Sequence, residues 1–429
     1  MKRAAGFSVT LTRALNGLRP TPLRRLAASN TKARDRALAD RLERQLILPA
    51  ADTPNEERAR AAMQDRGQFL ARQERWEDLS DEIRAADAAR DATPCAMPHA
   101  ELLSYGARAD VVHATEEALA DGANPSVAGI EALEQMLAEF PRDHAVAATV
   151  ALAHADIGWA WRGTGWPHEI PDRNQQLFAT HFERAARILE PFFDQQPESP
   201  LLAAARCTLL SGDPDPGKRL ADDYERLIDL NPGNPRPMRA LGNHLLPRWF
   251  GSYDALELEA RRTAARSGTI WGNGAYAWVY MDALAVDPGA ARALDLDFFL
   301  DGMRDILANR PDQHIANMLA AYAAITMDPN RTPSDAPPPL RETRLAIHAA
   351  LDWILAEYLF ELHPLVWAEA SIGPGLSDAR SAQLPMRSAL LRRGTMTARM
   401  TIARHFADEL LAGTTVAFSR HGLRLYPPQ

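Results

Sequence analysis

The amino-acid sequence predicts an all-α protein whose helices are arranged in pairs, with a small β-hairpin close to the carboxyl terminus. Three observations predict this fold class. Alternating apolar runs typical of strands are scarce, and amphipathic helical segments repeatedly end at a proline. The segment that follows each of these prolines is again helical but rich in small residues. A protein built from packed helix pairs accounts for all three.

The composition is that of an ordinary globular protein. The 429 residues are 46% hydrophobic and 24% charged, which argues against wholesale disorder and against a fibrous protein. The formal net charge of -8 argues against a nucleic-acid-binding surface, so no nucleic-acid partner is expected. Only Cys95 and Cys207 are present, too few for a disulfide framework or a four-thiolate metal site. They fit a reducing compartment, so we expect a cytoplasmic location.

The amino-terminal arm, residues 1–52, begins with a strongly basic stretch. Met1 to Arg34 contains eight basic residues and no acidic one, so the rest of the chain carries a net charge of -16. Apolar residues from Phe7 to Leu18 fall at helical spacing, as in a helix that binds an anionic membrane surface or in an organellar transit peptide. We favour the simpler interpretation, a solvated tail or an arm lying on the acidic body of the protein. A secretory signal is disfavoured because Ala4 to Leu11 is short and interrupted by polar residues.

An amino-terminal helical segment is expected over residues 53–125. Thr53-Pro54-Asn55-Glu56 combines a capping residue, a proline at the first helical position and a glutamate three residues after the cap. We therefore expect a helix from there through Phe69, Leu70 and Trp76. Further helices are expected over Ala100 to Leu119 and Ser126 to Phe140. No apolar run reaches the roughly 18 to 20 residues that a membrane-spanning helix needs.

The next part, residues 126–328, repeats one unit of helix, proline turn and helix. The first helix carries large apolar residues and the second carries small ones, which allows the two to pack closely. The prolines are Pro141, Pro197, Pro232 and Pro311.

The spacing of these prolines identifies the type of repeat. Pro197 and Pro232 are 35 residues apart, close to the tetratricopeptide period of about 34. The intervals of 56 and 79 residues on either side require insertions. Trp161 to Asp172 accounts for the first, and the helical stretch from Tyr253 to Ala285 for the second. The prediction is a tetratricopeptide-like helix-pair array with insertions.

The remainder is expected to follow a proline-rich linker, residues 329–339, which cannot continue a helix. In the carboxyl-terminal segment, residues 340–429, Leu340 to Glu361 predicts an amphipathic helix. Two short alternating runs then flank Arg420-His421-Gly422, which is the strongest hairpin signal in the chain.

Two loops within the array resemble those of a known family. Trp161-Arg162-Gly163-Thr164-Gly165-Trp166 and Leu245-Leu246-Pro247-Arg248-Trp249-Phe250-Gly251-Ser252 are similar to an Arg-Gly-Gly-Gly-Trp loop and a Leu-Pro-Arg/Lys-Trp-x-Gly-Ser loop. These belong to a family of uncharacterised bacterial tetratricopeptide-like proteins. The resemblance covers about a third of the chain, from about Asp156 to Tyr280, and implies a domain of unknown function. Thr164 replaces the middle glycine of the first motif.

The same two loops supply the candidate binding residues. Tryptophan and arginine beside flexible glycines bury large surfaces and offer directed hydrogen bonds, as a ligand or peptide site requires. The alternative is that each tryptophan fills the seam between helix pairs while each arginine binds helix-end carbonyls. The candidates are Trp161, Arg162, Trp166, Arg248 and Trp249.

Chemical motifs elsewhere favour structural roles. Gly212 to Arg219 has the spacing of a phosphate loop, but it carries two aspartates and two prolines and lacks the hydroxyl after the lysine. The histidines show no metal-ligand spacing, including His144 and His154, and no Gly-x-Ser-x-Gly motif occurs. No catalytic residue, metal or cofactor is therefore expected. Tyr276 and Tyr280 are four apart, as in a core stripe, and Asp295 suits a helix start.

These observations leave three hypotheses for function. The first is a helical-repeat scaffold that binds a protein or peptide partner, or a second copy of itself. The second is a small-ligand receptor or enzyme that uses a cleft near Trp166, His168, Glu169 and Arg248. The third is a peripheral membrane component recruited by residues 1–34.

Overall fold

The computed structural model of this protein describes residues 22–51, 53–163, 165, 167–332, 336–373 and 384–428. Within them, residues 22–32, 167 and 384–386 are described by their backbone alone. The α-helices are α2 (Pro22–Gln45), α3 (Asn55–Arg72), α4 (Trp76–Ala89), α5 (His99–Ala120), α6 (Ala128–Glu139), α7 (His144–Arg162), α8 (Asp172–Phe193), α9 (Pro200–Leu209), α10 (Leu220–Leu230), α11 (Arg236–His244), α12 (Tyr253–Trp271), α13 (Gly274–Val286), α14 (Leu296–Asn309), α15 (Gln313–Ala321), α16 (Pro338–Ala349), α17 (Leu351–Trp353), α18 (Pro364–Ile372), α19 (Leu384–His405) and α20 (Ala407–Leu411).

Short elements connect these helices. The 3-10 turns are η2 (Pro167–Glu169), η3 (Leu210–Gly212), η4 (Pro216–Lys218), η5 (Pro288–Arg292) and η7 (Pro329–Arg331), and the π-helical turns are η6 (Tyr322–Thr326) and η8 (Ile354–Tyr358). The strands are β1 (Leu46–Ile47), β2 (Thr415–Ser419) and β3 (Gly422–Tyr426). The predicted all-α class with a small carboxyl-terminal β element is confirmed.

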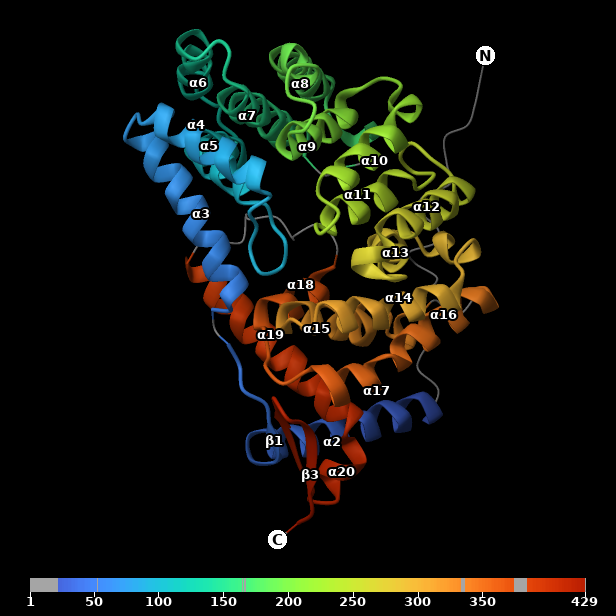
Figure 1. The fold of residues 1–429 in the computed structure, drawn as a ribbon. Coiled ribbons are helices and arrows are strands. Elements are labelled where there is room, and N and C mark those ends of the chain that lie inside the picture. Colours follow the sequence, from blue (N-terminus) through green and yellow to red (C-terminus); the bar gives the residue numbers. More distant parts are fainter. Residues whose placement is uncertain are drawn as a thin grey trace, which may run out of the picture.

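The helices follow one another in pairs along an arc (Figure 1). The pairs α6/α7, α8/α9, α10/α11 and α14/α15 are each separated by one of the four prolines recognised in the sequence. Helix–proline turn–helix is therefore the observed unit. The second helices are narrow because small residues dominate them: α7 buries six alanines between its first turn and Ala155.

The stretch from Tyr253 to Ala285, expected as an insertion, forms a further helix pair, α12/α13. It connects through Gly272 and Asn273, and Gly272 has a positive φ of 57°. A glycine turn replaces the proline turn here, which is why the interval between prolines doubles. The other expected insertion contains the end of α7 and the turn η2.

Side chains at the helix starts explain several boundaries. Asp143, Ser199 and Asp295 each accept hydrogen bonds from backbone N–H groups of the helix that follows. The capping predicted for Thr53 is wrong, because α3 begins after Pro54 with no side-chain cap. The helix also ends at Arg72, and Trp76 opens α4 instead. Glu56 turns away from the predicted capping box and binds a distant loop, described below.

Two hydrophobic clusters form the core and meet in α9. One contains α3 to α9 side chains, including Leu202 and Leu209. The other runs from Leu38 to Phe418 and includes Cys207 on α9. Its members lie on both sides of the proline-rich segment 329–339, including Leu319 and Leu340. Tyr276 and Tyr280, together with the neighbouring Trp278, are fully buried in this second cluster, as the core-stripe interpretation expected.

The two ends of the chain pack together. β2 pairs with β3 in the predicted hairpin, and β2 also pairs in parallel with β1 from residues 46–47. The sheet order is therefore β1-β2-β3. Arg399 of α19 donates to the carbonyl oxygens of Leu42 and Leu46 at 2.8 Å each. In Figure 1 the sheet, α2 and α20 lie together at the bottom of the molecule.

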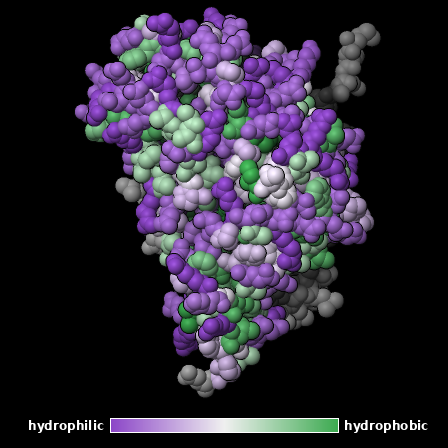
Figure 2. All heavy atoms as spheres, in the orientation of Figure 1, coloured by the Kyte–Doolittle hydropathy of each residue, from purple (hydrophilic) through white to green (hydrophobic). Residues whose placement is uncertain are grey.

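Figure 2 shows hydrophilic residues over most of the face turned to the viewer, with hydrophobic residues in small groups between them. Among the helices formed by the described residues, none has the length and apolar character needed to cross a bilayer. The basic stretch at the amino terminus lies largely outside the described residues.

Candidate binding groove

The first predicted loop begins at the end of α7. The guanidinium of Arg173 lies 5.3 Å from the Trp161 ring, and the Asn174 amide donates to the Trp161 carbonyl at 2.7 Å. Trp161 therefore contacts α8 through both its ring and its backbone carbonyl. Arg162 lies 5.2 Å over the ring of Trp159, and its Nη1 donates to the Gly163 carbonyl at 3.1 Å. Trp166 lies outside the described residues.

The second predicted loop follows α11. Arg248 lies 5.7 Å over the ring of Trp249, and Trp249 is 39% exposed. The Trp249 ring packs edge-on against His244, with ring centroids 6.4 Å apart. Gly251 is required for this turn, because a Cβ there would lie 2.4 Å from the Leu245 carbonyl oxygen.

A groove of about 370 Å³ lies between the two loops, on the arc formed by α5, α7, α9, α10 and α11. None of the predicted residues Trp161, Arg162, Arg248 and Trp249 is among those that line it. Its lining residues are Glu101, Trp159, Ala204, Cys207, Thr208, Ser211, Tyr224, Leu227, Asn234, Arg236, Pro237, Ala240 and His244.

The predicted loops nevertheless flank the groove. Trp159 lines it and stacks beneath Arg162, while His244 lines it and packs against Trp249. The residues predicted from the sequence are therefore neighbours of this candidate groove and do not line it. One signal in the sequence could have indicated this groove. Large or polar residues occur on the second helices, where small residues otherwise dominate.

One wall of the groove is a neutral hydrogen-bonded pair. The Tyr224 hydroxyl lies 2.8 Å from Nδ1 of His244, and Tyr224 is buried. Burial lowers the pKa of His244 to about 4, so its imidazole is neutral at pH 7. Burial also raises the pKa of the Cys207 thiol, and the nearby Asp223 adds to this effect. The thiol is therefore protonated at neutral pH and is a poor nucleophile.

The charged part of the groove is an ion pair between α5 and α11. Nη1 of Arg236 lies 3.3 Å from Oε2 of Glu101. The glutamate side chain is 27% exposed and the arginine side chain 42%. Burial raises the pKa of Glu101, although Arg236 opposes that shift. Asn234, itself buried, accepts a hydrogen bond from the Arg236 backbone N–H at 3.1 Å and fixes the start of α11.

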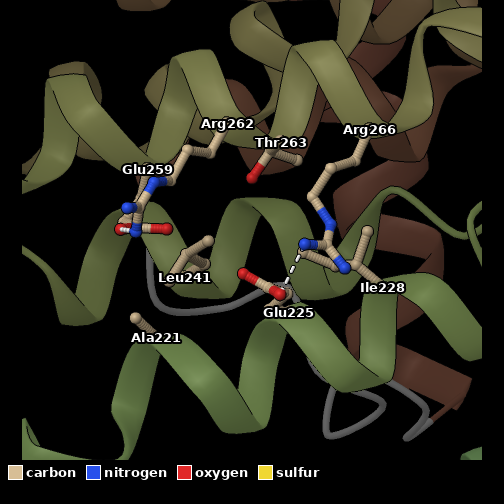
Figure 3. A pocket seen from close by; sticks show the side chains of 8 residues that line it. All are labelled: Ala221, Glu225, Ile228, Leu241, Glu259, Arg262, Thr263 and Arg266. Carbon is tan, nitrogen blue, oxygen red and sulfur yellow. Dashed lines mark hydrogen bonds and ion pairs between the residues drawn. The ribbon is translucent and has the colours of Figure 1, made fainter.

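A second hollow, between α10 and α12, is too small to bind more than one water. Its volume is about 10 Å³. Figure 3 shows Arg266 of α12 reaching across it to Glu225 of α10. Arg262 pairs with Glu259 on its own helix at 2.9 Å. The ion pairs of Arg266 connect α12 to α10, the Arg262–Glu259 pair lies within α12, and we assign none of them a binding role.

The segment that resembles a phosphate loop and the histidines considered as metal ligands make contacts within the protein. Gly212 to Arg219 joins α9 to α10 without a strand, and Arg219 pairs with Asp213 and Asp223. His154 contacts Glu134 and His181, not His144. His168 is exposed in η2. In the part of the chain that the structure describes, no group of three or more His, Cys, Asp or Glu residues is arranged to hold a metal ion.

Comparisons with known proteins add no further evidence. Scans against models of protein families, against curated proteins and against solved structures each returned no match. The similarity to an uncharacterised bacterial family therefore remains a prediction from the two loop motifs.

Proposed function

We propose that this protein is a helical-repeat scaffold that binds an extended segment of a partner protein in the groove of α5, α7, α9, α10 and α11. The observation that carries the proposal is the groove itself. Successive second helices of neighbouring pairs line it, and its walls combine aromatic rings, hydroxyls and one ion pair. Repeat proteins use such inner surfaces to bind extended chains.

The chemistry of the groove favours recognition over catalysis. The Cys207 thiol is protonated, and the His244 imidazole is occupied by the Tyr224 hydroxyl. Neither forms the activated nucleophile and base that covalent catalysis requires. Aromatic and arginine side chains at the rim, by contrast, are typical of binding surfaces.

A peptide-display selection on the full-length chain tests the proposal. Selected 12-residue peptides should bind the wild type and lose most of their affinity for Ala240→Trp, which fills the groove from α11. Leu258→Trp on α12 is the control, because Leu258 is exposed and lies outside the groove lining. Ser211→Trp repeats the test from η3 in case Ala240→Trp perturbs folding, which circular dichroism would report. Peptide binding that survives both groove variants would contradict the proposal.

The volume of the groove also favours a second candidate, a small-ligand receptor. About 370 Å³ lies within the range of small-molecule sites. A thermal-shift screen of metabolites separates the two functions. A compound that raises the melting temperature of the wild type but not of Ala240→Trp would support the receptor.

A further inference from the structure

The two side chains of the Glu101–Arg236 ion pair differ in how exposed they are to solvent. Glu101 lies in the first turn of α5, is the more buried partner and faces the groove. Arg108 and Asp87 also act on it electrostatically, but Arg108 is itself paired with Asp156 at 2.7 Å. Arg236 is the first residue of α11 and the more exposed partner. Its guanidinium otherwise contacts the Met97 sulfur. The carboxylate is thus the fixed half, and the guanidinium is the half that can move into water.

This inequality decides which ligand charge the groove accommodates. An incoming anion would pair with Arg236 and leave the half-buried Glu101 without its hydrogen-bonded counter-charge, and losing the partner of a largely desolvated charge is costly. An incoming cation would take the place of Arg236, whose side chain can swing out and be hydrated. Only the second exchange keeps the half-buried carboxylate of Glu101 directly paired.

The rest of the groove is compatible with a cation. Trp159 and Tyr224 present aromatic rings, which attract cations through their negative faces. The stacking of Arg162 on Trp159 shows that this ring already supports a guanidinium on one side. The chain outside residues 1–34 carries a net charge of -16, which would attract a basic partner over a long range.

We propose that the groove recognises a lysine or arginine side chain in the bound segment, and that this cation replaces Arg236 at Glu101. The inference rests on the proposed function, since it specifies the chemistry of the partner that the groove takes.

The test uses the peptides obtained by display on the full-length protein. They should be enriched in lysine or arginine, and replacing that residue by glutamine should weaken binding at least about tenfold, as expected for a charge-assisted pair. The variants Glu101→Gln and Arg236→Gln should act in opposite directions. Glu101→Gln should weaken binding about tenfold or more, whereas Arg236→Gln should strengthen it by removing the internal competitor.

Control variants and alternative outcomes complete the design. Arg266→Gln on α12 removes an arginine of similar exposure away from the groove and should leave affinity unchanged. Affinity that falls for Arg236→Gln and rises for Glu101→Gln would overturn the proposal in favour of an acidic partner. Uncharged peptides that bind in the groove would overturn it too, while leaving the proposed function intact. If Glu101→Gln fails to fold, the glutamine peptide and Arg236→Gln decide the question. Peptides that bind Ala240→Trp and Ser211→Trp with the same affinity as the wild type would instead refute the proposed function.

Discussion

At the scale of single residues, three helices meet at a hydrogen-bonded chain of Glu134, His154 and His181. Nε2 of His154 lies 2.9 Å from Glu134, and its Nδ1 lies 2.9 Å from Nδ1 of His181. A carboxylate only accepts, so Nε2 of His154 carries the hydrogen. Nδ1 of the neutral His154 then accepts from Nδ1–H of His181. The chain persists while His154 stays neutral.

This chain makes stability sensitive to acid. Burial, assisted by repulsion from His154, lowers the pKa of His181 to about 4 from the ordinary 6.5. Lowering the pH from about 7 to about 4 therefore protonates the unfolded state first and reduces the free energy of unfolding. His181→Asn should cost about 1 kcal/mol at pH 8. It should then lose less stability than the wild type by pH 4.5.

Urea denaturation of both proteins at several pH values measures this difference. The values at pH 8 serve as the internal control, since they contain the packing loss without the titration. Parallel losses of stability in the two proteins between pH 8 and 4.5 would show that His181 does not contribute.

The candidate site shows which of its residues could be predicted from the sequence and which could not. Trp161 and Arg248 stand out because tryptophan, arginine and glycine gather in short loops. Glu101 and Arg236 do not, because an acidic residue in the first turn of a helix and an arginine after a proline are ordinary in any helical protein. Their pairing depends on the curvature of the arc, which brings residues 135 positions apart together.

At the scale of elements, α11 and α13 cross with their backbones in near contact. A Cβ at Gly242 would lie 1.8 Å from the Val279 carbonyl oxygen. No side chain can be accommodated there without moving a helix. The glycine therefore sets the distance between two second helices next to the groove.

Gly242→Ala should consequently lower the free energy of unfolding by about 3 kcal/mol, at the upper end of overpacking effects. Gly268→Ala in α12 is the matched control, since nothing lies within 4 Å of its Cβ position. It should be neutral or stabilising by up to about 1 kcal/mol, because alanine favours a helix interior. Chemical denaturation checks both, and equal effects would argue against the close crossing.

Helix pairs were predictable where proline marks the turn between them, as at Pro197 and Pro232. The pair α12/α13 was not recognised as one, because Gly272 and Asn273 make its turn. The start of α3 was predicted for the wrong reason. Glu56 has the spacing of a capping box, but it accepts hydrogen bonds from the Thr93 hydroxyl and the Cys95 N–H at 2.8 Å each. The spacing of residues along the sequence cannot reveal that donors from a distant loop bind this carboxylate.

At the scale of the whole molecule, the arc is closed by contacts between its two ends. The Cys95 Sγ lies 3.3 Å from Asp312 at the start of α15. Arg387 of α19 pairs with Glu57 of α3. β1 is only two residues long and lies next to β2, some 370 residues away in sequence. A strand of that length leaves no periodic signal, so neither the third strand nor the closure was predictable.

This closure predicts that the chain unfolds as one unit. The sequence suggested a domain boundary at the proline-rich segment 329–339. Asn317, which precedes this segment, is nevertheless fully buried and forms hydrogen bonds with residues that follow the segment. Its Nδ2 donates to the Glu361 carbonyl at 2.7 Å, and its Oδ1 accepts from the His363 N–H at 2.9 Å and the Trp367 indole at 2.8 Å. One amide thus satisfies three groups of the carboxyl-terminal segment.

Asn317→Ala should cost about 3 kcal/mol or more, because it leaves those buried groups without partners. Asn330→Ala, which removes an exposed amide that donates to Asp328, should stay within about 0.5 kcal/mol. Urea unfolding followed by circular dichroism and by tryptophan fluorescence should give coincident transitions in the wild type. In Asn317→Ala both transitions should shift together. Separate transitions would mean that residues 340–429 fold independently, because a boundary at the proline-rich segment would confine the damage to one side of it.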